Sequence, residues 1–126
     1  MSTLRANTVA NAAGTGPATL TAQEAAKAHA NYDHTVPSIT RSLNVSSITD
    51  VGTGDFTTNF TNSFDAADYH LGGCCEGQTD AATSEAILWA VPAGQATGSD
   101  DNRTSSGAGG AVDTGRTCPN YMGDLA

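Results

Sequence analysis

The chain has 126 residues, of which 38% are hydrophobic and 14% charged, with 14 glycines and a formal net charge of -8. Its length fits one domain with an arm, and a composition rich in Gly, Ser, Thr and Asn favours β-structure with many turns over long exposed helices. Because no Lys/Arg cluster occurs, we expect no binding to nucleic acid or to an anionic membrane surface, since both need concentrated positive charge.

The beginning of the chain, MSTLRANTVANAAGTG, contains no apolar run of the length found in secretory signals. No apolar stretch of about 18 residues occurs elsewhere either. We therefore expect neither a signal peptide nor a segment inserted in a membrane.

Residues 1–20 are rich in small residues and are interrupted by glycine and proline, so we expect an extended arm that docks on another surface. Leu4, Val9 and Leu20 are the apolar residues of this arm and are its expected contacts. Residues 21–126 are then expected to form a single β-rich domain.

The arm is followed by a short helix signal. Thr21 and Glu24 have the spacing of a capping box, and alanines follow, which predicts one helix or turn over 21–27. Beyond it, 28–33 alternates small and aromatic residues in a pattern compatible with a strand.

Alternation of apolar and polar residues predicts strands within 36–48 and over 55–64, 69–75 and 83–92. The Gly-rich tail that follows is expected to be mostly loop, with one late strand over 112–118. The residues assigned to the core are Val45, Ile48, Phe56, Phe60, Ile87, Trp89 and Val91.

The sequence DVGTGD, residues 50–55, separates two of these strands and has the length of a hairpin connection. Gly52 and Gly54 would allow the reversal, and Asp50 and Asp55 would accept hydrogen bonds from backbone N–H groups of the turn. We therefore interpret this segment as a hairpin turn and not as a loop that binds phosphate or a metal ion.

These elements predict a small antiparallel β-sandwich or a jelly-roll-like domain with at most one short helix. Only about a dozen large apolar side chains are candidates for the core, and each contributes about 1.5–3 kcal/mol when buried. A monomer would then be marginal once chain entropy is counted, so we expect an oligomer, specifically a homotrimer.

The three cysteines, Cys74, Cys75 and Cys118, are expected to be free thiols. If one disulfide forms, Cys118 is the expected partner of Cys74 or Cys75, because a bond between sequence neighbours closes a strained ring. The adjacent pair also lacks the spacer that zinc sites use between thiolates.

No catalytic, cofactor or metal motif is found. The chain lacks G-x-S-x-G, H-E-x-x-H and Walker sequences. The histidines are expected at the surface or at an interface, and the acidic pairs, including Asp100 and Asp101, are expected to be solvated in loops. We therefore assign no catalytic, cofactor-binding or metal-binding residue.

The stretch RSLNVSSITDVGTGDFTTNFTNSFDAADY, residues 41–69, resembles a segment of bacteriophage and prophage tail-fibre or virion-fibre proteins. Its marks are the VSSITD-x-GTGD turn, the aromatic FTxNF strand and the following Asp-rich turn. The opening MSTLRANTVANAAGTGPATLT, with AAKAHANYD at 25–33, is similar to the arm and first strand that precede that segment. Together these cover about residues 1–75.

The resemblance implies a non-enzymatic structural protein of the virion, assembled in the cytoplasm of a host bacterium. It would be a fibre or spike component that docks through its arm on other virion proteins of the capsid or tail. Loops over 94–110 would then contact a glycan or protein of the host surface.

Two alternatives remain open. A capsid decoration protein that stabilises the head shell would also fit the short, repeat-free chain. A free-standing carbohydrate-binding module needs exposed aromatic side chains, whereas Phe56, Phe60 and Trp89 are expected in the core. An enzyme that cleaves polysaccharides would need two cooperating carboxylates in a cleft, for which this core leaves little room.

Overall fold

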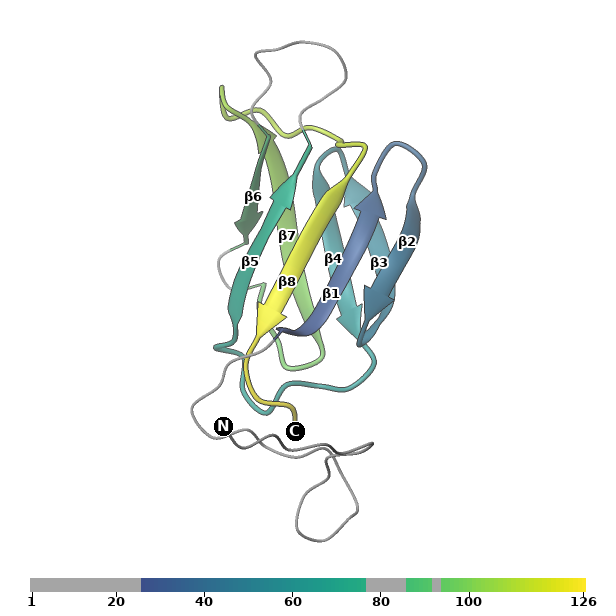
Figure 1. Ribbon diagram of the computed structural model, residues 1–126. Coiled ribbons are helices and arrows are strands. Elements are labelled where there is room, and N and C mark those ends of the chain that lie inside the picture. The colour runs from purple at the N-terminus through teal and green to yellow at the C-terminus, as the bar shows by residue number, and fades with distance from the viewer. Residues whose placement is uncertain (1–25, 77–85, 92–93) are drawn as a thin grey trace, which may run out of the picture.

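The computed structural model describes residues 26–76, 86–91 and 94–126. These residues form two four-stranded antiparallel sheets with strand orders β2-β1-β8-β5 and β3-β4-β7-β6, packed face to face (Figure 1). The predicted small antiparallel β-sandwich is thereby confirmed. The strands are β1 Ala26–Asp33, β2 Ser38–Leu43, β3 Val45–Gly52, β4 Asp55–Phe60, β5 His70–Cys75, β6 Ala86–Ala90, β7 Ser99–Ser106 and β8 Thr117–Met122.

The N-terminal predictions fall partly outside the described residues. The arm, with its expected contacts Leu4, Val9 and Leu20, lies there, as do residues 21–25. The predicted helix over 21–27 is wrong for Ala26 and Lys27, which begin β1. Alternate residues of β1 are buried between the sheets, and this burial outweighs the helix preference of its alanines.

The tail after residue 93 was predicted to be mostly loop with one late strand. Most of residues 94–126 do lie outside strands, but the tail forms two strands and not one. It contains β7 and β8, which are inner strands of their respective sheets. The predicted late strand over 112–118 begins only at Thr117. β7 was missed because its inward side chains, Asp100, Asn102 and Thr104, are polar and carry no hydrophobic alternation.

One part of the core is aromatic. The rings of Phe60, Phe64, Tyr69 and Tyr121 pack with centroid separations of 4.4 to 5.8 Å, mostly edge to face. Val45 and the predicted core residue Phe60 belong to this buried cluster, and Ile48 packs against it partly buried. Phe56 is buried further along β4.

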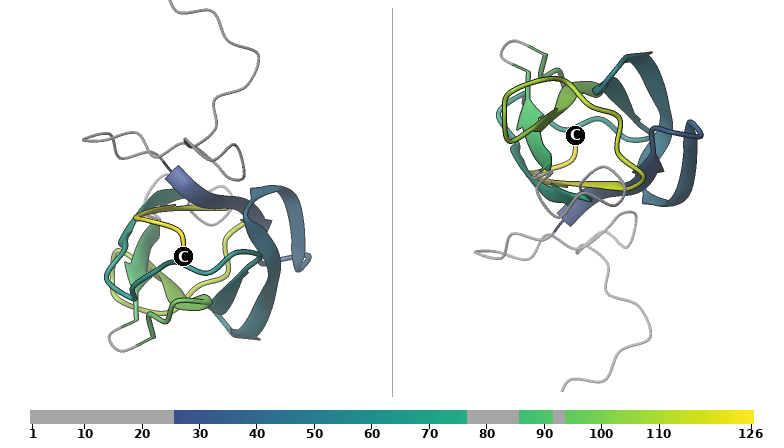
Figure 2. Two further views of the ribbon diagram at one scale, coloured as in Figure 1. Left: turned by 90° about the horizontal axis from the view of Figure 1, so that it is seen from below. Right: turned by 90° about the horizontal axis from the view of Figure 1, so that it is seen from above.

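The two ends of the sandwich are closed by different segments. The hairpin end comprises residues 34–37, 53–54 and 107–116, joined by hydrogen bonds such as His34 N–H to Thr114 O. The aromatic end comprises residues 61–69, 94–98 and 123–126, joined by bonds such as Phe64 N–H to Thr97 O. Viewed end-on, the sheets curve around the core, and the C-terminus lies over its middle (Figure 2).

Candidate functional site

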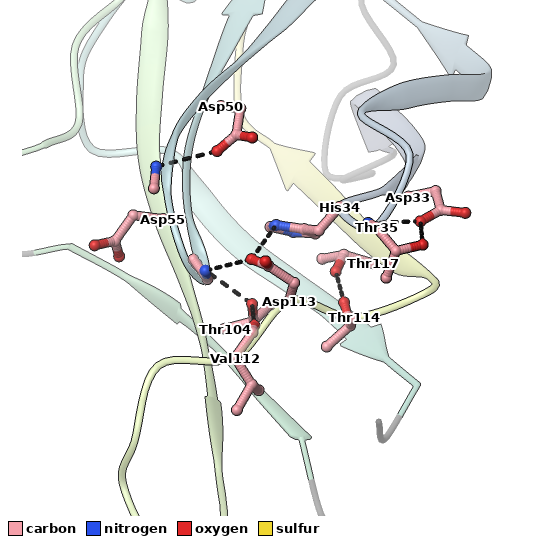
Figure 3. Close-up of polar contacts among 12 residues, drawn as sticks. Asp33, His34, Thr35, Asp50, Asp55, Thr104, Val112, Asp113, Thr114 and Thr117 are labelled. Atoms are coloured by element: carbon pink, nitrogen blue, oxygen red, sulfur yellow. Dashed lines mark hydrogen bonds and ion pairs between the residues drawn. The ribbon is translucent and has the colours of Figure 1, made fainter. Parts of the chain in front are cut away.

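The predicted turn residues lie at the hairpin end, where β3 and β4 pair (Figure 3). The Asp50 carboxylate accepts a hydrogen bond from the Gly52 N–H at 3.0 Å. Gly54 is buried with φ 71°, and a Cβ there would lie 2.5 Å from the Thr104 carbonyl oxygen. Gly54 is therefore required both by the turn geometry and by the close approach of β7.

Asp55 does not accept a hydrogen bond from the turn, which corrects its predicted role. Its carboxylate instead faces β7 and accepts two hydrogen bonds from Arg103, from Nε at 2.5 Å and from Nη2 at 2.8 Å. The N–H of Gly54 donates to Asp113, 2.7 Å away and 59 residues later in the chain (Figure 3). A short-range turn rule could not identify such a distant partner.

His34 is buried within the domain at the hairpin end, so the prediction of a surface or interface position is wrong for this histidine. Its ring packs against Tyr32 and Phe56 with centroid distances of 4.6 and 4.8 Å. Nδ1 lies 3.8 Å from the Asp113 carboxylate, and neither ring nitrogen has a hydrogen bond within the described residues. Burial lowers the pKa of His34 and so favours the neutral ring.

Asp100 is likewise buried and not solvated in a loop as predicted. Both carboxyl oxygens lack hydrogen-bond partners in the part of the chain that the structure describes, and burial raises the pKa of Asp100 to about 6. Nearby, Asn102 donates to the Tyr121 hydroxyl at 2.9 Å, and that hydroxyl donates to Thr58 at 2.9 Å. These groups form a polar layer inside the core.

Hydrogen bonds join Asn102, Tyr121 and Thr58 in the polar layer. The His34 ring nitrogens and the Asp100 carboxyl oxygens have no hydrogen-bond partner among the described residues. Among residues 26–76, 86–91 and 94–126, no group of three or more His, Cys, Asp or Glu side chains is arranged to bind a metal ion.

The outer face of the β3-β4-β7-β6 sheet carries the most ligand-like arrangement. Trp89 on β6 was predicted to be in the core, but 53% of its surface is exposed. Its indole N–H donates to Ser105 Oγ at 2.7 Å, which orients the ring on the sheet. Trp89 is opposite Arg103 in the strand register, and Arg103 is opposite Asp55, so the three form a row across β6, β7 and β4.

Two neighbouring hollows open on this face, and they share Val91 and Arg103. One, of about 270 Å³, is lined by Trp89 and Ser105, among others. The other, of about 200 Å³, includes Asp101 and extends to Val51 on β3. We call the exposed surface formed by Val51, Asp55, Thr57, Trp89, Val91, Asp101 and Arg103 the Trp89 face.

The polar side chains of the Trp89 face are fixed in place before any ligand binds. Asp55 and Arg103 form the two-pronged ion pair, and this hydrogen bonding lowers the pKa of Asp55 and raises that of Arg103. Thr57 donates to Asp101 at 2.7 Å in the adjacent row. An exposed indole beside fixed donors and acceptors can bind a ligand that has both an apolar face and a polar rim.

The strand prediction over 83–92 placed Trp89 and Val91 on one side and in the core. The register puts Trp89 on the outer side, opposite Arg103, and Val91, which follows β6, lines both outer hollows. Leu88 points inward instead, against Gly73 of the opposite sheet. The side chain of Ile87 lies outside the described residues. Arg103 and Asp101 were missed because β7 itself was missed, since SDDNRTSS carries no hydrophobic alternation.

No protein-family model matches the chain, and no curated protein or solved structure matches it significantly. Within the described residues, no helix is long and apolar enough to span a membrane.

Proposed function

We propose that this protein is a non-enzymatic structural component of a bacteriophage virion, and that its Trp89 face binds a glycan of the host surface. The resemblance of residues 41–69 to fibre-protein segments supports the virion setting. The observation that carries glycan binding is the exposed Trp89, oriented by Ser105 beside the Asp55–Arg103 pair.

The chemistry of a pyranose matches this surface. One face of the ring presents C–H groups, which pack on an indole, while the hydroxyls at its rim donate and accept hydrogen bonds. Asp101 supplies acceptors and Arg103 supplies donors within reach of the same hollows. Because both charged groups are already paired, ordering them costs little further entropy on binding.

The direct test is binding of the purified full chain to an array of bacterial surface glycans, followed by calorimetry on any glycan bound. Trp89→Ala should weaken binding by at least about tenfold, because a well-placed aromatic contact contributes more than 1 kcal/mol. Val36→Ala is the matched control, since Val36 is 67% exposed on a turn away from the Trp89 face.

Unchanged affinity in Trp89→Ala would contradict the assignment of this face. Binding only to a host protein, with no glycan bound at any concentration tested, would contradict the ligand class. The melting temperature of each variant should remain within a few degrees of wild type, because both side chains are largely exposed.

The location on the particle is tested separately. Antibody labelling of virions should appear at the tail or at fibre tips. Labelling spread over the whole head would favour the capsid decoration alternative, and an absence of the protein from particles would favour a free-standing binding module. Sedimentation should give a homotrimer, and a stable monomer at micromolar concentration would contradict it.

A further inference from the structure

Two of the three cysteines face one another across neighbouring strands. Cys74 on β5 is opposite Cys118 on β8 in the antiparallel register. Opposed residues in such a pair have Cα atoms about 4.5 or 5.5 Å apart, and both values lie within the range found across disulfides. The register alone thus brings this pair to bonding distance.

The thiols share the outer face of their sheet. In β8, Thr117 and Pro119 are buried while Cys118 between them is partly exposed. Cys74 opposite it is exposed, whereas Cys75 is partly buried and opposite Thr117. Of the two neighbouring cysteines, Cys74 is therefore the one on the same side as Cys118.

A third observation concerns the backbone beside the pair. Gly73 has φ 152°, and a Cβ on it would collide with the Cys118 carbonyl oxygen and lie 3.0 Å from the Pro119 Cα. Only glycine allows β5 to approach β8 this closely. The close approach lies directly beside the two thiols and favours the short separation that a disulfide needs.

We propose that Cys74 and Cys118 form a thiol–disulfide site that covalently joins the edge strand β5 to β8 in oxidising surroundings and opens in reducing ones. The oxidant is a small-molecule disulfide such as oxidised glutathione. The Cys74 thiolate attacks one of its sulfurs, forming a mixed disulfide and releasing one glutathione thiolate. The Cys118 thiolate then attacks the Cys74 sulfur and releases the second.

The balance of the reaction is two thiols and one glutathione disulfide converted to one protein disulfide and two glutathione thiols. The protein loses two electrons, and its two protons pass to the glutathiones. Cys74 attacks first because it is the more exposed thiol. Burial raises the pKa of the Cys118 thiol, which lowers its thiolate fraction and makes Cys118 the poorer first nucleophile.

After release from a reducing cytoplasm, this disulfide would link the edge strand β5 covalently to β8. β5 is an edge strand, and Gly72 and Gly73 supply it with no side-chain packing. A bond at Cys74 restrains this weak edge against fraying. The proposal does not depend on glycan binding and can fail or succeed independently of it.

The test uses the reduced full chain, incubated with oxidised glutathione under native conditions and then alkylated. One of the three cysteines should remain alkylatable. Trypsin cuts after Arg116, so the peptide 117–126 with Cys118 should be found joined to the peptide 42–103 by a bond that reducing agent breaks. Cys75→Ser should retain this bond, and Cys74→Ser should lose it.

Stability provides an independent measurement. Oxidation should raise the melting temperature of wild type and of Cys75→Ser by at least about 5 °C, and should leave that of Cys74→Ser unchanged. Alkylation of all three thiols after oxidation, loss of the bond in Cys75→Ser, or joining of the peptides only between two chains on a non-reducing gel would each overturn the proposal.

Discussion

The two ends of the sandwich are closed by different kinds of side chain. At the aromatic end, Phe60, Phe64, Tyr69 and Tyr121 fill the space between the sheets with ring contacts. The hairpin end combines the packed rings of Tyr32, His34 and Phe56 with buried hydrogen-bonded polar groups, such as the Thr114 and Thr117 hydroxyls 2.6 Å apart. The same two sheets thus enclose an aromatic end and an end that is partly polar.

This difference shows where the stability of the domain lies. Burial of the rings stabilises the fold roughly in proportion to the apolar area removed from water, and the edge-to-face contacts add to this. The polar groups instead determine which segments meet, because a buried donor or acceptor left without a partner costs about 1–3 kcal/mol. We therefore expect the aromatic end to supply stability and the hairpin end to supply specificity of strand order.

The largest expected effect is from Phe64→Ala at the aromatic end. Phe64 is 1% exposed and contacts the rings of Phe60 and Tyr69, so its truncation should lower the free energy of unfolding by about 3–5 kcal/mol in urea denaturation. The matched change at the hairpin end is Thr117→Val, which keeps the shape and should cost about 1 kcal/mol. Equal losses of the free energy of unfolding in Phe64→Ala and Thr117→Val would show that the two ends do not differ in their contribution to stability.

Asp100→Asn should stabilise the protein by about 3 kcal/mol at pH 8, since burial raises the pKa of Asp100 from 3.8 to about 6. The protonated form is the one that the fold favours, so wild-type stability is full below pH 3.8 and falls as the pH rises toward 6. The difference between the proteins should appear over this interval and then stay constant.

Denaturation at several pH values measures this difference, and Asp101→Asn on the outer face is the control. Asp101 is partly exposed and accepts one hydrogen bond from Thr57, so its replacement should change stability by less than about 1 kcal/mol. A stability gap that is already present at pH 3 in Asp100→Asn would disprove the link to ionisation.

Gly54→Ala tests the close contact at the hairpin end. Its φ of 71° and the Thr104 carbonyl 2.5 Å from the added Cβ predict a loss of about 2 kcal/mol. Gly109→Ala is the control, because Gly109 also has a positive φ, 85°, but has open space around it. It should therefore lose only about 1 kcal/mol. Similar losses of stability in Gly54→Ala and Gly109→Ala would show that the positive φ alone, and not the close contact, causes the destabilisation.

The smallest expected effect concerns acid. Burial lowers the pKa of His34, so the folded state favours the neutral ring, and its contribution is lost as the pH falls below the ordinary value of 6.5. The negative charges of Asp113, Asp50 and Asp33 raise this pKa and so oppose the loss. His34→Phe should be less sensitive to acid than wild type between pH 7 and 5.

Chemical denaturation of both proteins at pH 7 and pH 5 measures this difference. A constant gap between wild type and His34→Phe at the two pH values would show that His34 does not titrate in folding. Protonation of Asp100 stabilises the folded state, whereas protonation of His34 destabilises it. A double variant with Asp100→Asn and His34→Phe should therefore have a stability that changes less with pH than that of either single variant.

The hairpin between β3 and β4 was predictable because its signals are local. Phe56 and Phe60 alternate with polar residues, and glycines occur at a connection of hairpin length. β7 was not predictable in this way. Its buried residues are polar and are stabilised by groups such as Tyr121 and Thr58, which are distant in sequence.

The residues of the candidate site also divide into features that local patterns predict and features that only strand pairing decides. Alternation placed Trp89 and Val91 on one side of a strand, but a strand with apolar residues on both faces does not specify which face is buried. The pairing of β6 with β7 decided it, since Trp89 is opposite the outward Arg103. The side chains of the Trp89 face come from four strands that only folding brings together.

The sequence by itself determined the β class, the β3–β4 hairpin and the acidic surface, because period-two alternation, turn glycines and net charge act over a few residues or over the whole composition. Only the tertiary structure decided which strands are central, that His34 and Asp100 are buried, that Trp89 is exposed and that Cys74 is opposite Cys118. Each of these depends on pairing between residues far apart in the chain, which local patterns do not encode.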